Sequence, residues 1–216
     1  MILNDNKDHW YDGWFYDALI APHQDGLFAR IKELIEPGSK VLDIGCGTGR
    51  FSFSVAGKCR SVLGIDLSRR NIDRANLLLS RKSTPNVSFR HAGAEAVLSG
   101  SEEHYDYAVM TYMLHEVGER ERVRLLLGAA RAADALILGD YLVPGPGGFL
   151  GALTEIVEFG AGPAHYGSYR NFVRNGGIGG LAARSGLNMI REIRNKPPAS
   201  HLVLLRGGAL RPPPRL

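Results

Sequence analysis

The sequence predicts an α/β protein in which helices cover a parallel β-sheet. Two observations carry this prediction. Short apolar segments of β-forming residues alternate with segments whose apolar side chains recur at helical spacing, and the first of these strands runs into the glycine-rich stretch VLDIGCGTGR at residues 41–50. The chain has 216 residues, of which 44% are hydrophobic, enough for one substantial core. We therefore expect a single domain over residues 1–210 and a flexible tail at 211–216.

The first half of the chain alternates helix and strand. Residues 27–35 place apolar side chains at helical spacing and stop before Pro37, after which Lys40–Ile44 is expected to be a buried strand. A second apolar strand, Ser61–Ile65, precedes Ser68, which can cap the next helix. Further strands are expected at Val87–His91, Asp106–Thr111, Ala135–Tyr141, Met189–Ile193 and His201–Leu205, with a helix over residues 123–130 before the fifth strand.

The pattern loosens after the fifth strand. A proline and glycine cluster at residues 144–148 is followed by helical stretches up to residue 184, interrupted by glycines at 176–180. These glycines follow a helical pattern and no strand, so we interpret them as a helix break and not as a second phosphate loop. Because roughly 40 residues exceed an ordinary connection, we expect residues 144–185 to form a helical cap over the carboxyl edge of the sheet.

The composition excludes several classes of protein. The formal net charge is +4, but the arginines are spread along the chain among acidic residues, so we expect no specific nucleic-acid partner. Cys46 and Cys59 cannot form a disulfide framework, and no spaced group of Cys and His suggests zinc, so no metal site is predicted. The start lacks the order of a signal peptide, and no apolar run approaches the roughly 18 residues of a membrane span. A cytoplasmic protein is expected.

The glycine-rich turn predicts a nucleoside site. Gly45, Gly47 and Gly49 let the backbone approach a ligand without Cβ collisions, and the following helix offers unpaired N–H groups. The third glycine falls one position earlier than in the dinucleotide fingerprint, and Asp43 lies inside the motif. Asp66, at the end of the next strand, can accept hydrogen bonds from two ribose hydroxyls.

At these residues the chain resembles the class I S-adenosylmethionine-dependent methyltransferases that act on small molecules. VLDIGCGTG is similar to their first motif, VLGIDLS to the second with its terminal acid, and YDYAVMTYMLHEV to the strand and turn that face the acceptor. The resemblance implies a Rossmann-like, doubly wound sheet of seven strands, mostly parallel with the last strand antiparallel, and an N-terminal helical and aromatic segment over residues 1–36. It also implies methyl transfer from S-adenosylmethionine (SAM) to a small-molecule acceptor, with S-adenosylhomocysteine as product.

The same resemblance implies roles for residues along the cofactor. The backbone of Gly45, Cys46 and Gly47 would follow the cofactor, Asp43 would organise its methionine amino end, and Asp66 would bind the ribose hydroxyls. The remaining cofactor-binding residues implied by the resemblance are Tyr16, Gly49, Leu67, Ala94, Glu95 and Thr111. Leu67 would lie against adenine, the Ala94 amide near the ring edge, and the Thr111 carbonyl near the methionine ammonium group.

One stretch departs from the family pattern. Many relatives read GDAE where this chain reads AGAE, so that Gly93 replaces an aspartate that receives the adenine amino group, and Glu95 follows two residues later. The adenine contacts of this chain therefore differ from those of such relatives.

The acceptor side has its own candidates. His115, just past the fourth strand, is the predicted catalytic residue, placed to take a proton from a hydroxyl acceptor. The alternative is that His115 only hydrogen-bonds a loop and orients Glu116. His165, Tyr169 and Arg170 are predicted to bind an acidic or aromatic acceptor.

Other readings of the sequence stay open. A nicotinamide-dependent oxidoreductase shares the strand, the glycine turn and the distal acid, a nucleic-acid methyltransferase shares the fold, and a cofactor-binding protein without catalysis shares the motifs. Asp140, after the fifth strand, either faces the pocket or caps the loop that leads to Pro144. The sequence leaves the attacking atom of the acceptor and the oligomeric state undetermined.

Overall fold

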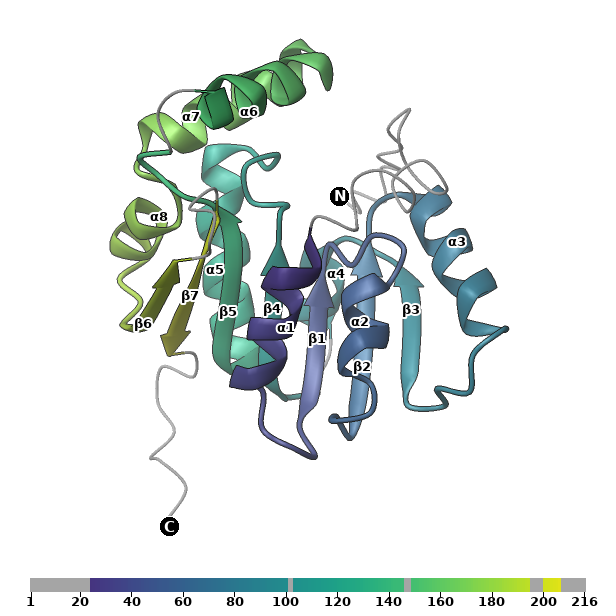
Figure 1. The fold of residues 1–216 in the computed structure, drawn as a ribbon. Helices are drawn as coiled ribbons and strands as arrows, with labels where there is room; N and C mark the ends of the chain where they lie inside the picture. The colour runs from purple at the N-terminus through teal and green to yellow at the C-terminus, as the bar shows by residue number, and fades with distance from the viewer. Residues whose placement is uncertain (1–23, 101–102, 146–148, 195–199, 207–216) are drawn as a thin grey trace.

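A seven-stranded sheet forms the centre of the molecule (Figure 1). The computed structural model describes residues 24–100, 103–145, 149–194 and 200–206. The strands follow the order β3-β2-β1-β4-β5-β7-β6. Their bounds are β1 Lys40–Ile44, β2 Ser61–Asp66, β3 Val87–His91, β4 Tyr105–Thr111, β5 Ala133–Tyr141, β6 Met189–Arg194 and β7 Ser200–Arg206. The first five strands pair in parallel, and β7 is antiparallel to both β5 and β6, which confirms the predicted Rossmann-like sheet.

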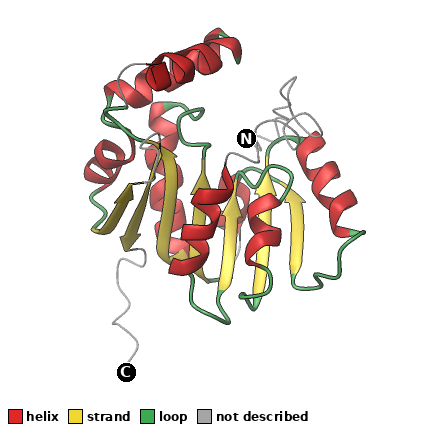
Figure 2. Cartoon of the chain, viewed as in Figure 1, coloured by secondary structure: helices red, strands yellow, loops and turns green. Residues whose placement is uncertain are grey.

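Helices cover both faces of the sheet, as Figure 2 shows in red against the yellow strands. Before the fifth strand they are α1 Asp25–Leu34, α2 Arg50–Val55, α3 Arg69–Leu79, α4 Ala94–Gly100 and α5 Glu119–Ala132. Helices α1 and α2 pack on one face, and α4 and α5 pack on the other. Ser68 caps α3 as its position predicts, because its side chain accepts a hydrogen bond from the amide of Asn71.

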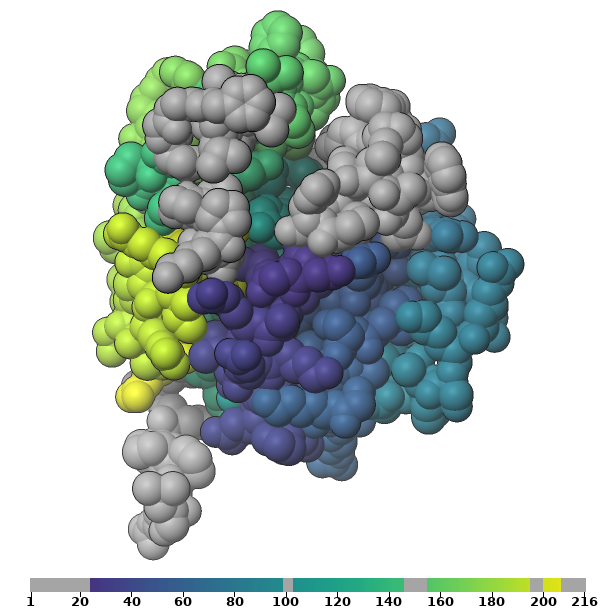
Figure 3. Space-filling view, in the orientation of Figure 1, coloured from purple at the N-terminus to yellow at the C-terminus, as the bar shows by residue number. Residues whose placement is uncertain are grey.

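Residues 149–185, within the range predicted to cap the sheet, form three helices between β5 and β6. They are α6 Phe149–Gly160, α7 Pro163–Arg174 and α8 Gly177–Ser185. The glycines at 176 and 177 separate α7 from α8, so the glycine run is a helix break. Helices α6 and α7 lie beyond the carboxyl ends of β4 and β5, whereas α8 packs against α5 and β5 (Figures 1 and 3). We call α6 and α7 the cap helices.

Alternation along the strands builds two apolar layers. Val109 in β4 and Ile137 in β5 face α1 and α2, while their neighbours Met110 and Leu138 face α5 and α8. All four side chains are fully buried. A strand covered on both faces has no polar side to show, which is why these segments read as continuous apolar runs in the sequence. Among the described residues, no helix has the length and apolar character needed to cross a membrane.

The close approach of β2 to β3 requires a glycine at position 64. A Cβ atom at Gly64 would lie 2.6 Å from Phe89 Cδ1 and 2.9 Å from the sulfur of Cys46. We expect Gly64→Ala to lower the free energy of unfolding by about 1–3 kcal/mol through overpacking. Urea denaturation checks this, with Gly57→Ala as the control because a Cβ at Gly57 meets nothing within 4 Å. Equal stability of the two variants would contradict the packing described here.

Candidate functional site

The glycine turn is fixed to the carboxyl end of β2. The amides of Gly45 and Cys46 donate to the carbonyl of Ile65 at 2.8 and 3.0 Å, and the amide of Gly47 donates to Asp66 Oδ2 at 2.8 Å. Gly45 has a φ of 72°, in the left-handed region that favours glycine. Asp66 Oδ1 also accepts from the amide of Ser68 at 2.8 Å. The turn and the acid predicted to share a nucleoside ligand are therefore adjacent.

Asp43 is a buried acid beneath this turn. Its side chain is fully buried in β1, where Oδ2 accepts from the hydroxyl of Ser52 at 2.6 Å. Burial raises the pKa of Asp43 to about 7, although the Ser52 hydrogen bond opposes this rise. Asp43 Oδ1 is buried and has no hydrogen-bond partner among the described residues. A buried acceptor of this kind is costly unless a donor reaches it, so the geometry fits a ligand amino group.

The other predicted cofactor residues follow the ends of β2, β3 and β4. The carbonyl of Leu67 accepts from the ring of His91 at 2.9 Å, when Nε2 carries the proton, and this contact links the ends of β2 and β3. Ala94 and Glu95 form the first turn of α4, and Thr111 is the buried last residue of β4. Cys46 is buried, and burial raises the pKa of its thiol well above the ordinary value, which excludes a reactive thiolate. Tyr16 lies outside the described residues.

His115 is bound to a buried acid on the neighbouring strand. Its Nδ1 lies 2.7 Å from Asp140 Oδ1, and the amides of Leu114 and His115 donate to Asp140 Oδ2 at 3.0 and 3.3 Å. Asp140 is fully buried in β5, so this one carboxylate holds both the loop after β4 and the His115 ring. The ring of His115 is therefore fixed by a strand carboxylate at the carboxyl edge of the sheet, and its catalytic role stays a prediction.

The cap helices add a second carboxylate, Glu158 in α6. Its Oε2 lies 2.6 Å from His165 Nε2 in α7 and 3.7 Å from His115 Nε2, and its Oε1 accepts from the Tyr141 hydroxyl at 2.7 Å. The ring of Tyr169 lies against both Tyr141 and His115, at centroid distances of 5.7 and 6.4 Å. The structure therefore brings the predicted residues His115, His165 and Tyr169 together.

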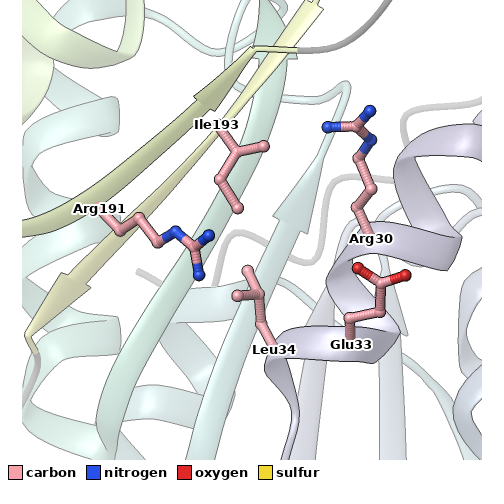
Figure 4. Close-up of a pocket in the computed structure, with 5 residues that line it drawn as sticks. All are labelled: Arg30, Glu33, Leu34, Arg191 and Ile193. Carbon is pink, nitrogen blue, oxygen red and sulfur yellow. The ribbon is translucent and has the colours of Figure 1, made fainter.

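The side chain of Arg170, also predicted to bind the acceptor, does not join His115, His165 and Tyr169. Its side chain is about half exposed and pairs with Glu155 Oε1 at 3.2 Å, so it is not part of the His115 cluster. A hollow of about 410 Å³ elsewhere, between α1 and β6, is lined by Arg30, Glu33, Leu34, Arg191 and Ile193 (Figure 4). None of the predicted site residues lines this hollow. We place the site at the carboxyl edge of the sheet because the glycine turn, Asp66 and the His115 cluster lie there.

Arg122 joins the loop after β4 to the cap. This α5 residue is only 1% exposed, and its guanidinium donates to the carbonyls of Leu114 at 2.7 Å and Ser168 at 2.7 Å and to Asn171 Oδ1 at 2.8 Å. It also lies over the ring of Phe172. Each of the three guanidinium nitrogens donates to at least one acceptor, which compensates the burial of this charge.

The charges of the cluster set its protonation. Burial acts to lower the pKa of His115, but the adjacent carboxylates, Asp140 first and then Glu116 and Glu158, outweigh it and raise the pKa to about 9. Burial acts to raise the pKa of Glu158, and the hydrogen bond from His165 and the charge of His115 hold it below its usual value. At neutral pH the cluster therefore contains an imidazolium at His115 and a carboxylate at Glu158.

Sequence reasoning missed Glu158, Tyr141 and Arg122. Glu158 and Glu155 lie three residues apart on a helix that is otherwise apolar except for Thr154, and this spacing was an available signal of a polar face. Asp140 was noted with two alternatives open, and the structure shows that it binds the loop after β4 and the ring of His115.

The strand order, together with an acid at the end of β2 beside the glycine turn, agrees with the fold that the resemblance to the class I methyltransferases implies. Residues 41–134 match the family described as "Methyltransferase domain". This stretch of the chain thus matches a methyltransferase family, which confirms the resemblance to the SAM-dependent methyltransferases and does not favour the oxidoreductase reading.

Individual relatives agree with this class. A ubiquinone biosynthesis O-methyltransferase from Leptothrix cholodnii is 36% identical over 80 residues, which are 37% of this chain and 34% of that protein. The O-antigen chain terminator bifunctional methyltransferase/kinase WbdD of Escherichia coli is 34% identical over 103 residues, 45% of this chain and 14% of that protein. The matches thus span about a third or less of these curated relatives.

Solved structures share the fold. The N-methyltransferase NodS from Bradyrhizobium japonicum, in complex with S-adenosyl-L-homocysteine, is similar with a TM-score of 0.61 and 16% identity. The similarity covers 90% of this chain and 91% of that one.

The raised pKa of His115 predicts a pH-dependent stability. Its folded pKa of about 9 exceeds the ordinary value of 6.5, so the stabilisation is fully present below pH 6.5 and is lost as the pH rises through 9. We expect the free energy of unfolding of the wild type to exceed that of His115→Gln by a margin that shrinks by up to about 3 kcal/mol over this range. Urea titrations in EDTA from pH 6 to 9.5 measure it, and a constant margin would contradict the assignment.

Proposed function

We propose that this protein transfers the methyl group of SAM to a hydroxyl group of a small-molecule acceptor. The observation that carries the proposal is the pair of acids around the glycine turn. Asp43 Oδ1 is buried below the turn with no hydrogen-bond partner in the described part of the chain, and Asp66 binds the amide of Gly47 beside it. SAM is a zwitterionic amino acid joined to a nucleoside. Its ammonium group can donate to Asp43, and its ribose hydroxyls can donate to Asp66. The matched methyltransferase domain includes both acids.

The residues fit SAM in the following way. Asp43 receives the ammonium group of the methionine end, with the carbonyl of Thr111 on the adjacent strand β4 as a second acceptor. Asp66 receives the ribose hydroxyls, and its carboxylate has lone pairs beyond those used by Gly47 and Ser68. Leu67, Ala94 and Glu95 follow at the adenine end. Gly45, Cys46 and Gly47 supply a backbone without large side chains toward the ligand, and Gly49 begins α2.

The acceptor site lies beside the donor site. A Cβ atom at Gly45 would be 3.0 Å from Met113 Cγ, so the glycine turn touches the loop that carries His115. Tyr169 and Tyr141 present aromatic rings next to His115, and His165 is bound to Glu158 behind them. These rings suit an aromatic acceptor that bears a hydroxyl group. The name of the Leptothrix relative, an O-methyltransferase, supports the choice of oxygen.

SAM supplies a methyl group on a sulfonium centre, which is already strongly activated toward displacement. The protein therefore has to align the acceptor oxygen and exclude water from it. His115 is the proposed catalytic residue, because it lies at the carboxyl edge and Asp140 fixes its ring. With a pKa of about 9 the imidazole is protonated at neutral pH, so it must pass this proton to a neighbouring group before it can accept one.

Calorimetric titration with SAM, S-adenosylhomocysteine and NAD tests the donor site. We expect the two sulfur nucleosides to bind and Asp66→Ala to lose about 2–4 kcal/mol of binding free energy, the worth of hydrogen bonds to a charged group. Asp73→Ala, which removes an exposed acid of α3, is the control and should bind as the wild type does. Preferential binding of NAD, or an unchanged affinity of Asp66→Ala, would refute the proposal.

Methyl transfer from radiolabelled SAM to small phenols and catechols tests the acceptor side. We expect His115→Gln to lower the rate by about 100-fold or more at unchanged SAM affinity. A weaker SAM affinity with an unchanged turnover rate would instead assign His115 a structural role. Methylation of amines in preference to hydroxyl compounds would overturn the choice of acceptor atom. The cytoplasmic location and the single domain over residues 1–210 stay predictions.

A further inference from the structure

Three buried donor atoms converge between the sheet and the cap helices. His115, Glu158 and His165 each offer one ligand atom, and these atoms all lie within 4.8 Å of one another. The side chains are 4%, 4% and 7% exposed, respectively. They come from three separate parts of the fold, namely the loop after β4, helix α6 and helix α7. The hydrogen bond between Glu158 and His165 joins the two cap helices. It does not by itself require the His115 ring to face the same point.

The distances are close to those of a metal site. Donor atoms of two His and one carboxylate around Zn²⁺ lie about 2.0–2.2 Å from the ion, and thus about 3.3 Å from each other. Here Glu158 Oε2 lies 2.6 Å from His165 Nε2 and 3.7 Å from His115 Nε2. Side-chain shifts of less than about 1 Å would bring these two pairs to the required spacing. The short His165–Glu158 contact is where an ion would replace a shared proton.

The surrounding groups favour a cation at this point. Asp140 and Glu158 are buried carboxylates, and Glu116 Oε1 lies 3.7 Å from His115 Nε2. Arg122 is the buried cation nearby, and its guanidinium is directed at the carbonyls of Leu114 and Ser168 and at Asn171. When both imidazoles are neutral, the cluster therefore carries excess negative charge. This negative charge favours a divalent ion, and the ion would bind the imidazoles in their neutral form.

Asp140 binds the ring nitrogen of His115 that faces away from Glu158. It binds His115 Nδ1 at 2.7 Å, which leaves Nε2 as the ring atom that faces Glu158. Histidines that ligate metal ions commonly donate the other ring N–H to a carboxylate, and this contact fixes the tautomer and the ring orientation. A catalytic base can use the same support, so the decisive feature is the convergence of His165 and Glu158 on the same point as His115.

We propose that His115, Glu158 and His165 bind one divalent transition-metal ion of the Zn²⁺ class. Two imidazoles and one carboxylate favour Zn²⁺ or a similar ion over Mg²⁺, which prefers oxygen ligands. Three protein ligands leave at least one position open, as in catalytic zinc sites. The role of the ion rests on the proposed function: it would acidify a hydroxyl group of the acceptor, and His115 would act as a ligand in the metal-loaded protein.

Titration of the EDTA-treated, tag-free chain with Zn²⁺ and with Co²⁺ tests the site. We expect one ion per chain, with affinity reduced at least about 100-fold in Glu158→Gln and in His165→Ala and about 10- to 100-fold in Asp140→Asn. Glu155→Gln is the matched control, since Glu155 lies one turn earlier on α6 and binds Tyr166 and Arg170. The ligand-field absorption of bound Co²⁺ should indicate four or five ligands and differ from that of the hydrated ion.

The outcomes separate the metal site from the proposed function. SAM titration of the same variants should give the wild-type affinity, so a chain that binds Zn²⁺ but not SAM overturns only the methyl-transfer proposal. Absence of stoichiometric uptake by the wild type, or uptake by Glu158→Gln and His165→Ala equal to that by Glu155→Gln, overturns the metal site and leaves a hydrogen-bonded network. If either variant fails to fold, Asp140→Asn and the Co²⁺ spectrum of the wild type decide.

Discussion

The carboxylate of Asp140 is the contact on which the His115 loop and its connection to the cap helices depend. It is fully buried in the strand β5, at the boundary between the sheet and the loop after β4. It receives the amides of Leu114, His115 and Tyr141 and the ring of His115. An ionised group at this depth is stable only when such donors surround it, so the loop, the ring and the strand are held in one arrangement.

From Asp140 outward, polar side chains form a connected series of contacts. His115 carries a proton beside Asp140, Glu158 follows beside His115, and His165 binds Glu158. Arg122 connects the same loop to α7 through Ser168 and Asn171. The cap helices are thus fixed to the sheet by polar contacts in addition to the apolar packing of residues such as Phe172. Removing one partner leaves a buried charge without compensation, which costs more than the pair contributes.

The strands and the glycine turn were predictable because each is encoded by a pattern of consecutive residues. The strands are buried on both faces and the glycine turn has a fixed spacing, so their positions follow from consecutive residues. The cluster at the cap could not be predicted because its contacts join residues far apart in sequence. Asp140 lies 25 residues after His115, and Glu158 lies 43 residues after His115. Motifs identified His115 and Asp66, but only the structure shows which groups bind their side chains. Helix α4 was not predicted because its short segment has no clear apolar periodicity.

Under the proposed function, the donor and the acceptor bind at the ends of neighbouring strands, but the residues that would hold them belong to different parts of the chain. Strands β1 and β4 pair directly, so the glycine turn after β1 and the His115 loop after β4 meet at one edge. The matched methyltransferase domain ends at residue 134, before Asp140, Glu158 and His165. The family match therefore covers the glycine turn and Asp66, to which we assign the donor, and does not reach the cap helices. The cap helices are joined to this edge by Arg122, Glu158 and His165 and by apolar packing of Phe172, so the proposed acceptor site depends on contacts that lie outside the matched domain.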